Sequence, residues 1–426
     1  MASTYLTRTF QSGGNRKKWT MSMWVKRSGL GSDQKLFQTY VSTYTHSPFD
    51  SSDRFQFQDG NGGNKVTSMK FRDTSAWYHI VIAIDTDLAT ADDRYKIYVN
   101  GERITAFDTS TNPSQGYEGE WNKAQLMNIG RHSAGTGYFD GLMSHINFCD
   151  GYQYQASDFG ETDATTGEWK IKTSPSVSYG TTGFFILKDG NTVTDSSSNS
   201  NTWTANGTLT KTESSPSNVF ATWNPLVPLG SFSYGNTVWD SVASGDGSAF
   251  STLGAETGKY YMECKITTSN TAGWELGVAP AQRLDGNTNG AGTSTIGGVG
   301  YTGDGNIRRA GTTVASGQTT FAQNDIISCA LDMDNRKVYF YKNGSALYGG
   351  VGVDLPSTTG AYLFATGDWW GSATTQSTAN FGNGYFGTTA VATNSGNGYQ
   401  DADGNGIMNY SVPTNYRCLC TKGLNQ

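Results

Sequence analysis

The chain has 426 residues, of which 15% are charged and 13% aromatic, and it carries a formal net charge of −6. Its 54 glycines, 9 prolines and abundant aromatic residues are typical of an all-β protein with many tight turns, and they exclude a disordered chain, because the aromatic residues can supply cores. An acidic chain lacks the basic surface that attracts nucleic acid, so we expect no nucleic-acid partner.

The apolar runs and the cysteines indicate the cellular compartment in which the protein assembles. The sequence has no apolar run of about 18 residues, so we expect no membrane insertion. The opening MASTYLTRTF has no apolar core of the length found in secretion signals. The five cysteines are scattered and include no Cys-x-x-Cys pair, which predicts free thiols rather than a structural zinc site. We therefore expect assembly in a reducing cytoplasm.

Residues 1–160 show the alternation of apolar and polar positions that is typical of antiparallel strands with one solvated face. The pattern is clearest in WTMSMWVKR, which begins at Trp19, and it continues in DRFQFQDG, KVTSMKFRD, WYHIVIAID and YKIYVNGERI. The last of these contains Asn100-Gly101, and Asn-Gly favours a two-residue hairpin because both turn positions need positive φ. We predict a first sandwich over residues 1–160.

Residues 161–225 are less regular. The segment YGTTGFFILKDG reads as a strand, while DSSSNSN is of low complexity and ATWNPLVPLG carries two prolines. We predict an irregular connector with one or two strands.

Strand patterns return over residues 226–386. The segment NDIISCALDMDNRKVYFYKNG, residues 324–344, repeats the order seen at residues 77–101: an apolar strand ending in Asp, a polar loop, a Tyr-rich strand and Asn-Gly. We predict a second antiparallel sandwich there and a C-terminal tail over residues 387–426. No segment shows sustained helical periodicity or heptads. The expected fold class is all-β, with two tandem antiparallel β-sandwiches.

The acidic residues do not indicate catalysis. A retaining glycosidase needs two carboxyl groups about 5 Å apart, which on one strand requires acids at alternate positions. Glu118 and Glu120 alternate but lie in a Gly-rich loop, and Asp332 and Asp334 flank a hairpin turn. His79 stands in mid-strand among apolar residues, which indicates a structural histidine. We predict no catalytic residues and no enzyme.

One segment resembles half of a calcium loop. DADGNG places Asp401, Asp403 and Asn405 at alternate positions before Gly406, as oxygen ligands recur in such loops. The twelfth position holds Val412 instead of a bidentate acid. The segment predicts either a simple Asx-Gly turn or a weak calcium site completed from elsewhere, and we expect no other cofactor.

Loop aromatics are the candidate ligand-binding residues. In GDWWGS, Trp369 and Trp370 would face opposite sides of a strand, so that one is exposed beside Asp368, an arrangement suited to a sugar's apolar face and hydroxyls. A second set surrounds the Gly-rich loop RHSAGTGYFD and consists of Arg131, His132 and Tyr138. The alternative for each set is packing against another domain or subunit.

Each half of the chain resembles a known family. The segments WTMSMWVK, AWYHIVIAIDT, RYKIYVNGE, NIGR and YFDGLMSHINF, in this order, resemble the concanavalin A-like (laminin-G) jelly roll. The segments GKYYMECKI, WELGVAP, GVGY, NDIISCALDMDNRKVYFYKNG and TANFGNG resemble a SPRY domain, which is also a sandwich of two antiparallel sheets.

The order of the parts resembles virion structural proteins of marine tailed phages, described as tail-fibre-like or appendage proteins. This rests on the laminin-G-like module, the SPSNVFATWNPL joint, the SPRY-like module and the segment from DADGNG to VPTNYRCLCTKGL. The resemblance implies a non-enzymatic virion protein, assembled in the host cytoplasm, that contacts other virion proteins and attaches to a host surface glycan or protein. It favours a homo-oligomer, by analogy with phage fibres a trimer. The alternative is an architectural head-decoration or adaptor protein whose sandwiches mediate virion assembly.

Overall fold

The fold is almost entirely β. The computed structural model describes residues 4–40, 43–188, 192–227, 229–241, 247–268, 273–283, 290–356, 360–368, 375–391 and 399–424. The chain divides into two compact units, Met1–Lys211 and Thr212–Gln426, here called unit 1 and unit 2. The predicted all-β class, with antiparallel sheets in both halves, is confirmed. None of the described helices is long and apolar enough to span a membrane.

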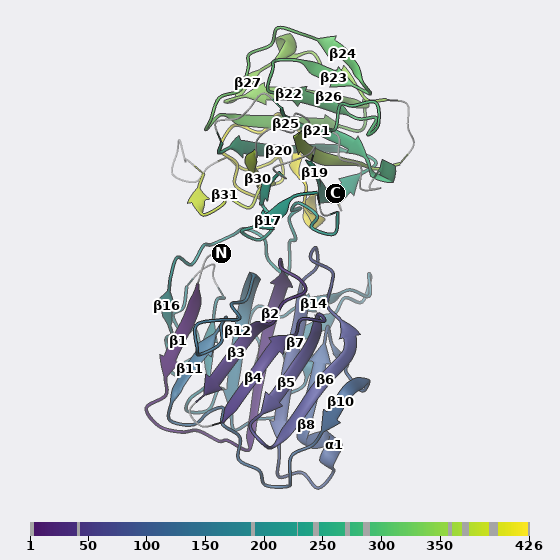
Figure 1. Ribbon diagram of the computed structural model, residues 1–426. Coiled ribbons are helices and arrows are strands. Elements are labelled where there is room, and N and C mark those ends of the chain that lie inside the picture. Colours follow the sequence, from purple (N-terminus) through teal and green to yellow (C-terminus); the bar gives the residue numbers. More distant parts are fainter. Residues whose placement is uncertain are drawn as a thin grey trace. The chain divides into compact units, whose positions relative to one another are not determined.

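Unit 1 contains an eight-stranded sheet in the order β10-β6-β5-β4-β3-β11-β1-β16. Its strands are β1 (Tyr5–Thr9), β3 (Gln34–Tyr40), β4 (Tyr44–Phe49), β5 (Arg54–Asp59), β6 (Gly63–Lys70), β10 (Phe107–Thr111), β11 (Leu126–Ile129) and β16 (Thr204–Asn206). In Figure 1 the labels of these strands run across unit 1 from β16 on the left to β10 on the right.

The second sheet of unit 1 has six strands in the order β15-β12-β2-β7-β8-β9. Its strands are β2 (Lys18–Arg27), β7 (Tyr78–Asp85), β8 (Tyr95–Val99), β9 (Glu102–Arg103), β12 (Gly141–Asp150) and β15 (Phe184–Ile186), and the short helix α1 (Ala91–Arg94) links β7 to β8. The predicted hairpin joins β8 to β9, and Asn100 and Gly101 adopt φ of 47° and 91°.

The two sheets of unit 1 enclose one apolar core. Its side chains come from alternate strand positions, for example Met21 and Met23 of β2 and Phe55 and Phe57 of β5, all of which are buried. Because successive side chains of a strand point to opposite faces, the intervening residues lie on the outer faces of the sheets.

The segment expected to be a connector, residues 161–225, is shared between the two units. The hairpin of β13 (Gly160–Thr162) and β14 (Trp169–Ile171) belongs to a cluster on the outer face of the six-stranded sheet, in which Trp169 packs with Val81 and Ala83. Strands β15 and β16 extend the two sheets of unit 1. From Thr212 onward the chain belongs to unit 2. The apolar side chains of this segment are needed to complete both units, which explains why it is not an independent connector.

Unit 2 is built on two larger sheets and the small β31–β32 pair (Tyr385–Phe386 and Thr389–Ala390). One sheet contains β17 (Ser231–Ser233), β18 (Val238–Asp240), β20 (Lys259–Ile266), β25 (Ile326–Asp332), β26 (Lys337–Lys342), β27 (Ser345–Ala346), β28 (Val353–Asp354), β30 (Gln376–Asn380) and β33 (Arg417–Cys418). The other contains β19 (Gly247–Ala255), β21 (Trp274–Pro280), β22 (Val299–Thr302), β23 (Ile307–Arg309), β24 (Thr312–Ala315) and β29 (Tyr362–Asp368). Apolar residues of both sheets form one core.

Residues 399–424, part of the expected tail, complete unit 2. Strand β33 pairs in parallel with β20, and the short helix α2 (Thr421–Leu424) follows it. The buried carboxylate of Glu263 on β20 accepts hydrogen bonds from the backbone N–H groups of Asn409 and Tyr410, both at 2.8 Å. The segments that lead into and out of unit 2 are also joined, because Ala221 N donates to Leu419 O at 2.9 Å.

Candidate functional site

A row of polar residues crosses the outer face of the eight-stranded sheet, with one residue on each strand. The strand registers place these residues directly opposite one another in the order Thr204, Thr7, Asn128, Gln38, His46, Gln58, Asn64 and Thr111. Opposed residues in antiparallel strands have Cβ atoms about 5 Å apart. The row, called the polar row below, therefore spans the full width of the sheet.

The half of the polar row on β5 and β6 is partly exposed and held by amide hydrogen bonds. Gln56 Nε2 donates to Asn64 Oδ1 at 2.9 Å and to Gln58 Oε1 at 3.4 Å. These contacts fix the orientation of the amides while Gln58 and Asn64 keep part of their surface open to solvent. This half offers both hydrogen-bond donors and acceptors.

The centre of the polar row contains unsatisfied nitrogen atoms. Asn128 Nδ2, Gln38 Nε2 and His46 Nε2 have no hydrogen-bond partner among the described residues, and Asn128 and Gln38 are only 1% and 0% exposed. Their oxygens are occupied, because Arg131 Nε donates to Asn128 Oδ1 at 3.1 Å and Ser133 N donates to Gln38 Oε1 at 3.2 Å. A buried polar group left without a partner costs about 1–3 kcal/mol. The centre is therefore less stable than a fully paired arrangement.

His46 is uncharged at neutral pH. Burial, followed by the nearby charges of Lys35 and His132, lowers its pKa to about 3. Its ring lies 4.6 Å from the ring of Tyr44, centroid to centroid. The imidazole therefore supplies one donor and one acceptor nitrogen to the row.

The structure brings together three of the predicted binding residues, Arg131, His132 and Tyr138, in the loop that follows β11. The guanidinium carbon of Arg131 lies 3.4 Å from the centroid of the Tyr5 ring, and the Tyr5 and Tyr138 rings are 6.1 Å apart. His132 Nδ1 accepts a hydrogen bond from Ala134 N at 3.0 Å. Through Arg131, this loop contacts the polar row at Asn128. Tyr5 was not predicted, because its partners are far away in the sequence.

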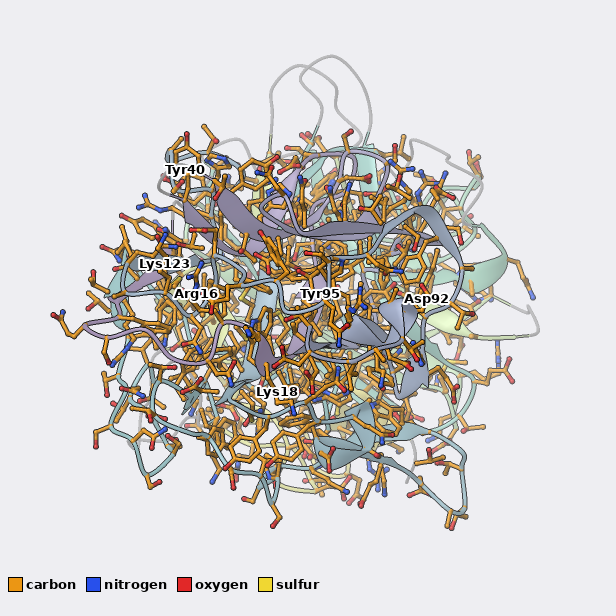
Figure 2. The ribbon with its side chains drawn as sticks, turned by 90° about the horizontal axis from the view of Figure 1, so that it is seen from below. Arg16, Lys18, Tyr40, Asp92, Tyr95 and Lys123 are labelled. Atoms are coloured by element: carbon orange, nitrogen blue, oxygen red, sulfur yellow. The ribbon has the colours of Figure 1, made fainter. Side chains whose placement is uncertain are left out.

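Exposed apolar side chains lie beside the polar row. Tyr40 pairs with Tyr44, two positions along β3 and β4 from Gln38 and His46, and so lies on the same outer face. Tyr40 is 51% exposed, and Leu126 of the neighbouring strand β11 is 45% exposed. Figure 2 views unit 1 from below, where Tyr40 lies near the periphery of the molecule. Aromatic side chains next to amides are a suitable surface for sugar rings.

Three of the four acids considered for catalysis form ion pairs, and the fourth, Asp334, accepts a hydrogen bond from Gly258 N at 2.7 Å. Arg16 contacts Glu118 at 3.0 Å and Glu120 at 3.5 Å, and Lys123 contacts Glu120 at 3.3 Å. Both cations are labelled in Figure 2. Asp332 is buried and lies 2.9 Å from the Lys259 ammonium nitrogen. Neither pair of alternate acids lies on the polar row.

His79 is a buried structural histidine, as predicted. Its ring stacks on Trp24 with centroids 4.7 Å apart, and its Nε2 lies 2.9 Å from Ser22 Oγ. Trp169 Nε1 donates to Nδ1 at 3.0 Å. Burial lowers the pKa of His79 to about 3, so the ring is neutral and fully hydrogen-bonded.

The second predicted binding set, Asp368, Trp369 and Trp370, belongs to unit 2 and not to the polar row. Asp368 is 1% exposed, and its Oδ2 accepts hydrogen bonds from Ser241 Oγ at 2.9 Å and Thr375 Oγ1 at 3.2 Å. Its carboxylate therefore stabilises unit 2 and is not presented at the surface, because the strand alternation turns it inward. Trp369 and Trp370 lie outside the described residues.

The DADGNG segment forms a hydrogen-bonded turn. Asp401 Oδ1 accepts from the backbone N–H groups of Asp403 at 3.0 Å and Asn405 at 2.7 Å, and Oδ2 accepts from Cys418 N at 2.9 Å. Asp403 is paired with Arg417. Within the described residues, no group of three His, Cys, Asp or Glu side chains could hold a metal ion. The Asx-Gly turn explains this segment without calcium.

Comparisons with known proteins identify a module in each unit. Residues 2–153 match the family model of the concanavalin A-like lectin/glucanases superfamily, and residues 259–366 match that of the SPRY domain. This confirms the predicted pair of modules and their order. A search of curated proteins finds no match.

Three of the solved structures that are similar to the chain are SPRY domains. The SPRY domain of human HERC1 is 21% identical, with a TM-score of 0.29 and coverage of 34% of this chain and 87% of that one. The TRIM65 PSpry domain is 14% identical, with a TM-score of 0.29 and coverage of 37% and 91%. A human SPRY domain is 14% identical, with a TM-score of 0.25 and coverage of 33% and 91%.

Proposed function

Because the chain carries a concanavalin A-like module followed by a SPRY domain, we propose that it is a non-enzymatic virion protein of a tailed phage that binds a host surface glycan. The virion placement is supported by the resemblance of the order of its parts to phage appendage proteins. The glycan is supported by the chemistry of unit 1. The protein serves as an adhesin, in a tail fibre or another appendage, and contacts other virion proteins.

The polar row is the observation that carries the glycan proposal. Its amides and hydroxyls match the donors and acceptors of sugar hydroxyls, and the exposed Tyr40 offers an apolar platform beside them. Adjacent strands are about 4.8 Å apart, which is close to the length of one hexose in an extended glycan. A linear glycan lying across β4, β5, β6 and β10 would therefore meet one polar side chain at each step, in the order His46, Gln58, Asn64 and Thr111.

Binding without cleavage fits the residues of this face. The polar row contains amides, hydroxyls and one imidazole but no carboxylate, whereas hydrolysis of a glycoside normally needs two. A ligand on an open sheet face makes few enclosed contacts, so each copy binds weakly. Several copies in a homo-oligomer, a trimer in our proposal, would raise the overall affinity through effective concentration.

Binding of the full chain to bacterial cells and to immobilised surface polysaccharides tests this function. Replacing Gln58 and Asn64 together with Ala removes two partly exposed row residues. We expect about a tenfold loss of affinity, since each hydrogen bond contributes about 0.5–1.5 kcal/mol. Gln115→Ala, an exposed amide away from the row, is the matched control. An antibody against the chain, applied to phage particles in electron microscopy, tests the virion placement.

The architectural role is the competing outcome. Folded, multivalent protein that binds no glycan or cell but binds capsid or tail protein tightly would replace the adhesin proposal with a head-decoration or adaptor function.

A further inference from the structure

Free hydrogen-bonding capacity at the centre of the polar row consists mainly of donors. The unpartnered Asn128 Nδ2 and Gln38 Nε2 are amide NH₂ groups, and the oxygens of both side chains are already accepting. Both amides are buried, so they act on a ligand at the surface through their N–H dipoles and not by direct contact. The unsatisfied N–H groups also leave partial positive charge at this point of the sheet.

Arg131 adds a full positive charge next to these donors. Among the other arginines of unit 1, five form ion pairs with acids, namely Arg16, Arg27, Arg54, Arg72 and Arg103. Arg8 and Arg94 donate through their terminal nitrogens to protein oxygens. Arg131 donates only through Nε, to Asn128, and within the described part of the chain no carboxylate pairs with it. Its two terminal nitrogens are available to a ligand.

The guanidinium of Arg131 is also held in a fixed orientation. It lies over the Tyr5 ring at 3.4 Å and is tied to Asn128 by the 3.1 Å hydrogen bond. A stacked, planar guanidinium presents its terminal N–H groups as a fork, which matches the two oxygens of a carboxylate. The half-buried position strengthens such a contact relative to one in open water.

We infer that Arg131, with the amide donors of Asn128 and Gln38 behind it, binds the carboxylate of an acidic sugar. The glycan bound by the polar row therefore contains uronic-acid or related units. The inference rests on the proposed glycan-binding function and specifies its ligand class. The carboxylate contacts the Arg131 fork, and the neutral part of the glycan extends toward Gln58 and Asn64. The chain's net charge of −6 repels an acidic polymer at long range, so recognition depends on these local donors.

Matched polysaccharides test the inference directly. Alginate, polygalacturonate and hyaluronan would each be immobilised beside their carboxyl-reduced forms, in which every uronic acid has become a neutral sugar. We expect the full chain to bind at least one native polymer about tenfold more tightly than its reduced form, since a charge-assisted hydrogen bond contributes about 1.5–3 kcal/mol.

Variants assign the effect to the site. Arg131→Gln should remove the preference for the native polymer, so that the native and reduced polymers bind this variant equally. Arg131→Lys should restore part of the preference, since a lysine keeps the charge but not the fork. Arg103→Gln, an exposed arginine paired with Asp93, is the control and should retain the full preference. Circular dichroism and the melting temperature verify that each variant is folded.

The outcomes separate this inference from the proposed function. Equal binding of native and reduced polymers overturns the inference that Arg131 binds a carboxylate and leaves the proposed glycan binding intact. Tighter binding of dextran sulfate than of every uronate polymer assigns the position to sulfate and also overturns the inference. Absence of binding to any saccharide, neutral or acidic, overturns both.

Discussion

Unit 2 should lose stability as the pH rises from about 5 to 8, and Glu263→Gln should remove about half of this loss. Glu263 is completely buried on β20, and burial raises its pKa to about 7. The hydrogen bonds from the backbone N–H groups of Asn409 and Tyr410 oppose this rise, because they favour the ionised form. Glu275 on β21 is similarly buried, and burial raises its pKa to about 7. All four histidines of the chain lie in unit 1, so these two glutamates dominate the titration of unit 2 in this interval.

The sign and size follow from proton linkage. Below pH 4.5 both glutamates are protonated in the folded and unfolded states, and neither costs stability. Between pH 4.5 and 7 the unfolded chain releases protons that the folded chain retains, so the free energy of unfolding falls as the pH rises. A shift from 4.5 to about 7 corresponds to about 3 kcal/mol for each group, at about 1.4 kcal/mol per pKa unit.

The buried thiols provide an assay confined to unit 2. Cys264, Cys329, Cys418 and Cys420 are free and buried, so a maleimide labels them only when unit 2 unfolds. Urea titrations at pH 5, 6, 7 and 8, read by mass spectrometry of these cysteine peptides, give the free energy of unfolding at each pH. Glu256→Gln, an exposed site, is the matched control and should keep the wild-type slope. Stability that is constant or rises with pH in the wild type, or an unchanged slope in Glu263→Gln, would refute the reasoning.

Three further predictions concern single contacts. Trp169→Ala should raise the pKa of His79 from about 3 toward its ordinary value of 6.5, because the substitution exposes the imidazole ring to water. NMR titration of the imidazole protons measures this pKa. An unchanged value would show that Trp169 does not shield the ring. Asp53→Asn should lower the free energy of unfolding of unit 1, measured by urea titration, by about 3 kcal/mol. The reason is that the buried Arg27 guanidinium loses the carboxylate that lies 3.0 Å from it. A loss below about 1 kcal/mol would argue against a buried ion pair. EDTA and millimolar Ca²⁺ should both leave the melting temperature unchanged, because backbone N–H groups already donate to the Asp401 carboxylate oxygens. A rise in melting temperature with Ca²⁺ would instead support a calcium site in this segment.

Local pattern was enough to predict several strands and one hairpin turn, although β3 and β4 were not predicted. Period-two alternation identified β2 and β7, and Asn-Gly identified the turn at Asn100-Gly101, because both signals arise from neighbouring residues. The polar row could not be predicted in the same way. Thr7 and Asn128 meet through a register set by strands far apart in the sequence, and neither is unusual in its own segment.

The candidate binding residues were predicted in part for the same reason. Arg131, His132 and Tyr138 are close in the chain, so one Gly-rich loop indicated all three. Their partner Tyr5 is distant in sequence and gave no local signal. For Asp401, the local motif indicated calcium ligands, whereas the backbone of Cys418, from a later segment, completes its hydrogen bonding.

The pairing of the segments that lead into and out of unit 2 has a consequence for modularity. Residues 219–221 and 419–421 are bonded through Ala221 N to Leu419 O and Thr421 N to Val219 O, both at 2.9 Å. An early and a late segment of unit 2 are therefore held side by side by backbone hydrogen bonds. A recombination event could insert such a module into a surface loop of another protein, or remove it, without stretching the host backbone.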